Sequence, residues 1–382
     1  MRVVFVDLHD PAAIRTWSGT PHHMGRALEQ QGIEVVRSQA LVTRERLHHR
    51  LKAALCRRLH AGRYVVRYEN DVLQSYGDQV LKLAEASGAS AVLSTGSLPV
   101  SRLPGDLPVL FWADATFACA QRMAPAQPPL ARTSVSAGHR YERAALRRAS
   151  AALYASEWAA QSAVSDYAAE PSRVHVVPFG ANLESEPDPE LVASAVRNRS
   201  SQEVNLLFLA ARWHDKGGDI AAETARLLNH AHVPATLHVV GCHPPGRYCD
   251  EQFVRCHGFL RKDIPKQVIE LIRILSSSHF LILPTRHECY GIVFCEASSR
   301  GVPSLATRVG GTPTAVRDGC SGKLFELGDG PVAYADYVAE IMRSPQRYLD
   351  LALSSFQEYR TRLNWRTATG RVVALLDGLL SG

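Results

Sequence analysis

Short apolar segments rich in β-branched residues alternate with helical patterns along almost the whole chain. Such alternation predicts parallel β-sheets whose strands are joined by helical crossovers, which is an α/β fold. The segments are apolar throughout rather than at every second position, which indicates sheets covered by helices on both faces. We predict strands at 3–6, 33–36, 91–93, 109–112, 152–154, 174–177, 204–210, 236–240, 280–283 and 303–306, and helices at 22–31, 136–149, 157–168, 219–230, 264–277 and 292–300.

The chain is too long for a single ordinary domain, because 382 residues compare with ~150 residues for a typical domain. A polar, proline-containing stretch at 184–203 separates the two halves, and a new apolar segment begins at Val204. We therefore predict two doubly wound, Rossmann-like domains, 1–184 and 185–359, that face a central cleft. Ligands of doubly wound sheets bind beyond the carboxyl ends of the strands, so this cleft is the expected site.

Positive charge is concentrated in the first half of the chain. Residues 1–183 carry 21 Lys and Arg against 15 Asp and Glu, whereas residues 184–382 carry 22 of each. Much of the excess lies at 44–67, where leucines recur every four residues and form an apolar stripe opposite a basic face. Such a helix either lies on an anionic membrane surface or packs its leucines into a core, and the sequence leaves both open. No nucleic-acid-binding motif accompanies the charge, so a nucleic-acid partner is not expected.

Cysteine usage and hydropathy point to a cytoplasmic protein. The N-terminal apolar segment is too short for a signal peptide, and no apolar run approaches the ~18 residues of a membrane helix. The eight cysteines are therefore expected to be reduced. Cys242, Cys249 and Cys256 lack the tight pair spacing of a structural zinc site, so no metal is expected there.

The densest set of reactive side chains is the segment 284–297, which follows the predicted strand 280–283. Glu288 stands in the loop at the carboxyl end of this strand, and Gly291 permits close approach of a ligand to the backbone. The helix that begins near Ile292 directs free amides toward the cleft, which favours an anion. Glu296 follows one turn later. Two carboxylates beside an anion site suit the hydroxyl groups of a sugar or a ribose.

A second loop of the same domain carries cations. Arg212 and Lys216 follow the strand 204–210 and precede Gly217 and another helix. Together they could neutralise a diphosphate, because Arg offers a planar fork and Lys a point charge. Alone this loop is a weak signal, but it gains weight from the glutamates about 70 residues on.

These residues resemble the retaining glycosyltransferases of family 4, which have the GT-B fold. The resemblance is carried by Arg212, Lys216-Gly217, Glu288 with Glu296 eight positions later, the glycine-rich stretch 301–322, and Val177-Pro178-Phe179-Gly180. It is specific over about 204–326 and looser in the first half, where Trp17–Pro21 resembles the family's N-terminal phosphate loop.

The resemblance implies a role for each matching residue. Glu288 would contact the transferred sugar and Glu296 the ribose hydroxyls, while Arg212 and Lys216 would bind the diphosphate. The donor would also be faced by the amides of Gly291, Ile292 and Val293, by His287 beside them, and by Gly19 of the N-terminal loop. The final helix, about 360–382 with Trp365, would cross back onto the first domain.

The sequence departs from the family's pattern at two positions. Many relatives carry a histidine after a strand of the first domain, where Asp114 is our candidate equivalent. A carboxylate there would orient an acceptor hydroxyl or stabilise positive charge in the transition state; an ordinary turn or helix-cap Asp is the alternative. Thr314 stands where many relatives have a glutamate.

We thus expect a retaining glycosyltransferase that uses a UDP- or GDP-sugar and needs no cofactor or metal. The acceptor would be a glycan or a lipid-linked sugar of a bacterial-type envelope polysaccharide (lipopolysaccharide, O-antigen or capsule). The protein would be cytoplasmic, with peripheral binding to the inner face of the plasma membrane through 44–67 as a further option. Two alternatives stay open: a GT-B sugar-nucleotide epimerase, and a non-catalytic relative that binds a nucleotide or a glycan.

Overall fold

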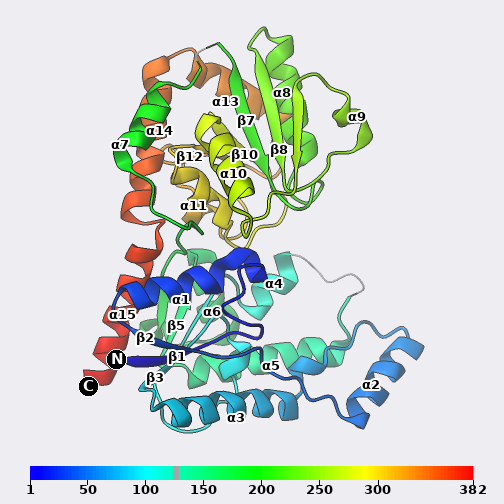
Figure 1. The fold of residues 1–382 in the computed structure, drawn as a ribbon. Coiled ribbons are helices and arrows are strands. Elements are labelled where there is room, and N and C mark those ends of the chain that lie inside the picture. The colour runs from blue at the N-terminus through cyan, green and yellow to red at the C-terminus, as the bar shows by residue number, and fades with distance from the viewer. Residues whose placement is uncertain (124–128, 201, 382) are drawn as a thin grey trace. The chain divides into compact units, whose positions relative to one another are not determined.

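The computed structural model describes residues 1–123, 129–200 and 202–381. The chain forms two compact units (Figure 1). Unit 1 comprises Met1–Pro178 and Trp365–Gly382, and unit 2 comprises Phe179–Asn364. Among the described helices, none combines the length and the apolarity that a membrane span requires.

Unit 1 contains a six-stranded parallel sheet in the order β2-β1-β3-β4-β5-β6. Val4 and Val6 of β1 point to the face that carries α3, α5 and α6, whereas Phe5 points toward α1 on the other face. The strands are β1 (Arg2–Val6), β2 (Glu34–Arg37), β3 (Ala91–Ser94), β4 (Val109–Ala113), β5 (Ala151–Tyr154) and β6 (Val174–Val176), and the helices are α1 (Thr20–Gln30), α2 (Leu47–Arg58), α3 (Asn70–Ser87), α4 (Phe117–Met123), α5 (Arg132–Arg148), α6 (Glu157–Tyr167) and α15 (Trp365–Ser381).

Unit 2 contains a second six-stranded parallel sheet in the order β12-β11-β10-β7-β8-β9. Right-handed crossovers in this order place α8 on one face and α10 and α11 on the other. The strands are β7 (Val204–Leu209), β8 (Ala235–Val240), β9 (Val254–Gly258), β10 (Phe280–Leu283), β11 (Ser304–Thr307) and β12 (Gly322–Phe325), and the helices are α7 (Pro189–Arg197), α8 (Gly218–His230), α9 (Gly246–Cys249), α10 (Pro265–Ser277), α11 (Ile292–Ser298), α12 (Thr312–Ala315), α13 (Pro331–Met342) and α14 (Pro345–Thr361).

The boundaries between the units differ slightly from the predicted ones. Unit 2 begins at Phe179 rather than at residue 185, because the Phe179 backbone carbonyl accepts a hydrogen bond from the Tyr290 hydroxyl (2.9 Å) and the two rings pack edge to face. The chain returns to unit 1 at Trp365 rather than at about residue 360. Trp365 packs on Trp112 of β4, with ring centroids 5.6 Å apart.

Candidate functional site

The reversal of strand order in unit 2 lies between β7 and β10. β7 pairs with β8 on one side and with β10 on the other, so the chain winds away from this point in both directions. The loops after β7 (210–217) and after β10 (284–291) leave the same edge of the sheet. Open α/β sheets bind their ligands at such a point, and both loops carry the residues that the sequence singled out.

Lys216 and Glu288 meet across this point. The Lys216 ammonium lies 2.8 Å from a Glu288 carboxylate oxygen and also donates to the His287 backbone carbonyl at 2.8 Å. The two side chains are only 18% and 15% exposed. The structure therefore brings a cation and a carboxylate together at the edge of the sheet, although 72 positions separate them in the chain.

Further contacts fasten the two loops to one another. The Arg286 backbone amide donates to the Asp215 carbonyl (3.0 Å), and the Arg286 guanidinium forms an ion pair with Asp219 (2.9 Å). Burial favours the neutral form of Asp219, but the hydrogen bond and charge of Arg286 outweigh it and hold the pKa of this carboxyl below its ordinary value. The loops thus form one preorganised surface rather than two independent segments.

Gly217 is required for this close approach. Its φ of 76° lies in the left-handed region, and a Cβ atom added here would lie 2.1 Å from the Pro284 carbonyl oxygen. Gly217 also occupies the N-cap position of α8. Gly291 plays the same part before α11, with a φ of 89°. The amides of Ile292 and Val293 then begin that helix, where the first N–H groups have no partner within the helix.

Glu296 is paired with a cation that the sequence analysis missed. The Glu296 side chain is only 5% exposed, and the Lys262 ammonium forms an ion pair with it. Lys262 follows β9, an edge strand that the apolar pattern did not predict, so its place at the carboxyl edge of the sheet could not be recognised. The sole sequence signal was a pair of cations, Arg261 and Lys262, just before the predicted helix.

Two other predicted residues of unit 2 are more exposed. The Arg212 side chain is 64% exposed and forms an ion pair with Asp215 (2.9 Å), three positions on, rather than with Glu288. His287 is exposed, and the contact that joins it to Lys216 runs through its backbone carbonyl. Both residues lie beside the reversal of strand order between β7 and β10. Their side chains, unlike those of Lys216 and Glu288, are not held there by an ion pair shielded from solvent.

Asp114 and Gly19 belong to unit 1. Asp114 directly follows β4 and is half-buried between that strand and α4. Gly19 caps α1 with a φ of 84°, and it follows Trp17 and Ser18, whose φ values of 46° and 57° are uncommon for residues with a side chain. Such strained backbone is concentrated at functional sites in proteins, and the role of Gly19 in binding the donor phosphates stays a prediction.

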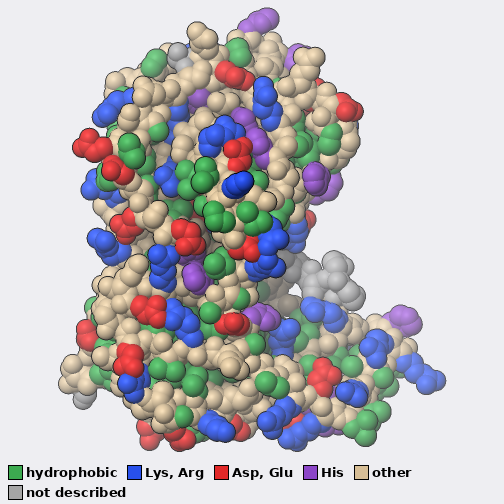
Figure 2. All heavy atoms as spheres, viewed as in Figure 1, with side chains coloured by type: hydrophobic (Ala, Val, Ile, Leu, Met, Phe, Trp, Pro, Cys, Tyr) green, Lys and Arg blue, Asp and Glu red, His purple; other side chains and the backbone are tan. Residues whose placement is uncertain are grey.

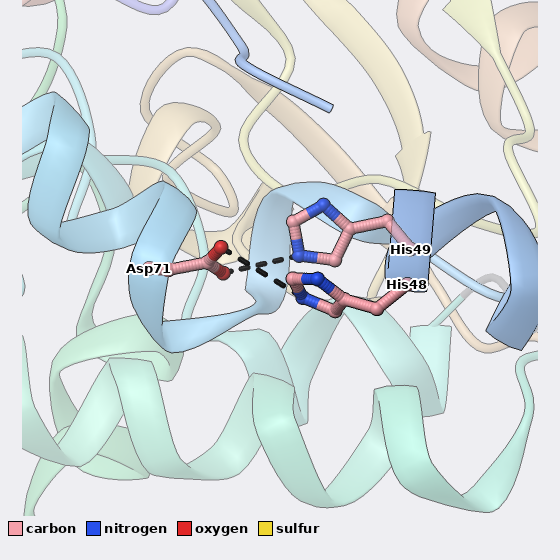
Figure 3. Close-up of side chains that lie close together, drawn as sticks. All are labelled: His48, His49 and Asp71. Atoms are coloured by element: carbon pink, nitrogen blue, oxygen red, sulfur yellow. Dashed lines mark hydrogen bonds and ion pairs between the residues drawn. The ribbon is translucent and has the colours of Figure 1, made fainter. Parts of the chain in front are cut away.

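One group of His and Asp side chains in the described residues has the spacing of metal ligands. His48, His49 and Asp71 place their ligand atoms within 4.8 Å of one another (Figure 3). The Arg46 backbone N–H donates a hydrogen bond to Nδ1 of His49. The ring proton is therefore on Nε2, which donates a hydrogen bond to the Asp71 carboxylate (3.1 Å). A metal-bound imidazole needs the proton on the other nitrogen. The group therefore fits a clamp between α2 and α3, not a metal site.

One part of the chain, which contains the loops 210–217 and 284–291, matches a known protein family. Residues 203–344 match the model of the family described as glycosyl transferases group 1. This region is thus similar to the group 1 glycosyltransferases. The match includes the loops 210–217 and 284–291 together with Lys262 and Glu296. The resemblance to family 4 glycosyltransferases, which was inferred from these loops, is thereby confirmed for the group 1 region.

A curated relative extends beyond the group 1 region. D-inositol 3-phosphate glycosyltransferase 1 of Catenulispora acidiphila is 29% identical over 228 residues, which cover 56% of this chain and 54% of the relative. The chain thus spans about half the length of this relative.

Solved structures match the whole chain. Sucrose-phosphate synthase from Thermosynechococcus elongatus gives a TM-score of 0.71 at 18% identity, covering 100% of this chain and 99% of its own. WaaG, a glycosyltransferase involved in lipopolysaccharide biosynthesis, gives 0.63 at 14% identity, covering 98% and 99%. Alr3699/HepE of Anabaena in complex with UDP and glucose gives 0.64 at 16% identity, covering 99% and 100%. The fold is GT-B, as the sequence predicts.

Proposed function

We propose that this protein is a retaining glycosyltransferase that moves a sugar from a UDP- or GDP-sugar to a glycan or lipid-linked acceptor. The observation that carries the proposal is the contact between Lys216 and Glu288 at the strand-order reversal of a group 1 region. A half-buried cation and carboxylate side by side match the two halves of a nucleotide-sugar: the diphosphate needs positive charge, and the sugar needs a hydrogen-bond acceptor for its hydroxyls.

In the proposed reaction, the bond between the sugar C1 and the diphosphate oxygen breaks while the acceptor oxygen bonds to C1 on the same face. The acceptor proton passes to the departing diphosphate oxygen, so the protein supplies no nucleophile. Lys216, Arg212 and the amides at Gly291, Ile292 and Val293 would neutralise the developing charge on the diphosphate without a metal ion. Glu288 would hold the sugar hydroxyls, and Asp114 of unit 1 would orient the acceptor hydroxyl.

Glu296 and Lys262 suit the nucleoside part of the donor. The Glu296 carboxylate is buried and already neutralised by Lys262, so it can accept hydrogen bonds from ribose hydroxyls without adding net charge beside the diphosphate. The UDP complex of the structurally similar Alr3699/HepE makes a uridine nucleotide the first donor to test.

The donor site is tested by thermal unfolding with UDP-, GDP-, ADP- and TDP-sugars, each with and without magnesium. A donor at 100 times its dissociation constant should add ~2.7 kcal/mol of stability. Lys216→Ala and Glu288→Ala should abolish transfer while the protein stays folded. Lys323→Ala is the matched control, because it breaks an exposed ion pair with Asp318 in the same unit (3.4 Å). Full activity in both site variants would refute the assignment.

The same assay separates the alternatives. Donor turnover that needs no acceptor would favour a sugar-nucleotide epimerase, and donor binding without any turnover would favour a non-catalytic relative. The acceptor panel should contain lipid-linked sugars and envelope glycans of the lipopolysaccharide, O-antigen and capsule types, since WaaG acts in lipopolysaccharide biosynthesis. It should also contain a phosphorylated polyol, because the curated relative is named for inositol 3-phosphate.

We also propose that α2 holds the protein at an anionic membrane surface. The sequence left open whether the leucine stripe faces a core or a membrane, and the structure leaves it outside any core: the four side chains are 56–73% exposed (Leu47, Leu51, Leu55 and Leu59). Figure 2 shows basic and hydrophobic side chains together over α2. In this arrangement the leucines insert into the bilayer while the arginines contact the headgroups. Each cation near an anionic surface contributes about 1 kcal/mol of binding free energy.

Vesicle sedimentation tests this second proposal. The protein should bind phosphatidylglycerol vesicles at low salt and release them as salt screens the charges. Leu51→Ser with Leu55→Ser should weaken binding strongly, whereas Leu191→Ser, a similarly exposed leucine on α7 (71%), should not. Equal binding by the two variants would show that the leucines of α2 do not contact the membrane.

A further inference from the structure

A hollow of about 530 Å³ on unit 1 is lined almost entirely by arginines. It lies between the segment that leads from β3 to β4 and the outer side of α5. Its lining comprises Ser101, Arg102, Arg140, Arg143, Arg147 and Arg148, with Ala144 among them. Neither the proposed donor site nor α2 uses these residues.

Four of the five arginines in this hollow keep their charge without an acidic partner in the described residues, whereas the fifth, Arg148, lies within electrostatic reach of Asp106. Within the described parts of the chain, Arg102, Arg140, Arg143 and Arg147 form no ion pair. Their partners are neutral: Arg140 donates to the Ser136 hydroxyl (3.0 Å), Arg102 donates to the Asn70 side-chain oxygen (3.2 Å), and the Arg143 guanidinium lies 5.9 Å from the centre of the Tyr167 ring. These contacts orient the guanidinium groups while leaving their positive charge available.

The spacing on α5 is unfavourable unless an anion is present. Arg140, Arg143 and Arg147 lie three and four positions apart, so they share one face of the helix, and like charges at these spacings destabilise a helix. Glu142 of the same helix cannot compensate, because its side chain is buried and accepts a hydrogen bond from the Ser97 hydroxyl (2.7 Å). A bound anion would remove the repulsion.

The hollow lies toward the end of unit 1 opposite to Asp114, the residue of this unit that is proposed to orient the acceptor. α5 joins β4 to β5 and runs antiparallel to the strands, so it ends at the amino edge of the sheet. Arg148 at that end donates to the backbone carbonyls of Leu103, Gly105 and Leu107 just before β4 begins (2.9 Å each). At ~1.5 Å per residue, the arginines of the hollow on α5 lie from about 12 Å (Arg140) to about 22 Å (Arg147) along the helix from Arg132 at its start. The hollow is thus remote from Asp114, which follows the opposite end of β4.

We propose that this arginine hollow binds a phosphate ester. Four unpaired guanidinium forks match the charge and the acceptor oxygens of a phosphate, which Arg binds in bidentate fashion. Two sources offer the same phosphate chemistry, a phospholipid headgroup and a soluble phosphate ester. The lipid source rests on the proposed membrane binding of α2, and the soluble source does not.

The test uses one probe for each source. Glycerol 3-phosphate, titrated calorimetrically, reports the site without a membrane, and vesicles of phosphatidic acid in phosphatidylcholine report the lipid source. The hollow variant carries three substitutions on α5, and the matched control removes three exposed arginines elsewhere that form no ion pair among the described residues (Arg140→Gln, Arg143→Gln and Arg147→Gln; Arg197→Gln, Arg343→Gln and Arg371→Gln). All the substituted side chains are exposed, so both proteins should fold, and circular dichroism checks this.

The hollow variant should bind the lipid vesicles on the order of 100-fold more weakly than the control variant, at about fivefold per arginine. It should also lose most of its affinity for glycerol 3-phosphate. If the hollow variant loses affinity for glycerol 3-phosphate but not for the vesicles, the site binds a soluble phosphate ester. This result can occur even if the α2 leucine variants show no loss of vesicle binding. Equal affinities of the two variants for both probes, or equal losses in both, would overturn the proposal.

Discussion

Glu142 should make the stability of unit 1 depend on pH. This carboxyl is 1% exposed on α5, where the Ser97 hydroxyl donates to it at 2.7 Å and the Tyr154 hydroxyl lies at 3.4 Å. Burial raises the pKa of Glu142 from 4.5 to about 7, since desolvation outweighs these hydrogen bonds. In the unfolded chain the same carboxyl would titrate near its ordinary value.

The sign and size of the effect follow from this difference. Between pH 4.5 and about 7, the folded protein keeps the Glu142 proton while the unfolded chain has lost it. The free energy of unfolding therefore falls as pH rises through this window and levels off above it. At ~1.4 kcal/mol for each pH unit of difference, the total is about 3 kcal/mol. Glu142→Gln keeps the shape and removes the titration, so the variant should lack this decline.

Hydrogen exchange at α5 and β5 measures the effect within unit 1, and comparison of variants at equal pH cancels the intrinsic exchange rates. As pH rises from 4.5 to about 7, the protection of these amides against exchange in the wild type should fall relative to their protection in Glu142→Gln. Glu85→Gln, an exposed glutamate on α3, should track the wild type at every pH. A constant difference between wild type and Glu142→Gln would show that Glu142 is already ionised in the folded protein, and the reasoning from burial would fail.

Two further substitutions test the loops of unit 2. Gly217→Ala should abolish donor binding in the thermal-shift assay, because an alanine in this left-handed backbone costs ~1–2 kcal/mol and its Cβ would overlap the Pro284 carbonyl. Gly330→Ala is the control: its added Cβ would meet open space, so this variant should bind the donor normally. Lys262→Met should lower both the melting temperature and the affinity for the donor, because it leaves the buried Glu296 carboxylate without its cation, at a cost of up to ~3 kcal/mol. An unchanged melting temperature would contradict the buried ion pair.

The core strands were predictable because burial on both faces leaves a continuous apolar run. β1, β4, β7 and β10 all lie close to their predicted ranges. Two edge strands of unit 2, β9 and β12, escaped prediction, although the edge strands β2 and β6 of unit 1 were predicted. β9 lacks an apolar run: it contains Arg255 and His257 and is largely exposed or half-buried. The missing β9 in turn concealed Lys262.

The segment 184–203 shows a different kind of miss. Its polar composition suggested a linker, yet α7 occupies 189–197. The Asp188 side chain accepts hydrogen bonds from the backbone amides of Glu190 and Leu191 (2.8 and 3.2 Å), and Pro189 takes the first helical position. An Asp-Pro pair followed by Glu is a recognised helix start, so this helix carried a local signal that composition alone obscured.

Two of the candidate donor residues, Lys216 and Glu288, each stand in a short loop directly after a predicted strand. Parallel strands bring such loops to one edge of a sheet, and there the structure places Lys216 beside Glu288. The sequence could not show that Lys216 would pair with Glu288 while Arg212 turned to Asp215, because that choice depends on side-chain packing between two loops.

The distinctive features of unit 1 have no comparable motif. A local pattern revealed the leucine stripe of α2, but only the fold shows that these leucines stay exposed and that the arginines of α5 gather in a hollow. If unit 2 handles the donor and unit 1 the acceptor or the surface that presents it, the two should respond separately to substitution. Changes at Lys216 or Glu288 should alter donor affinity and leave binding to anionic lipid intact, whereas changes on α2 or in the hollow should do the reverse.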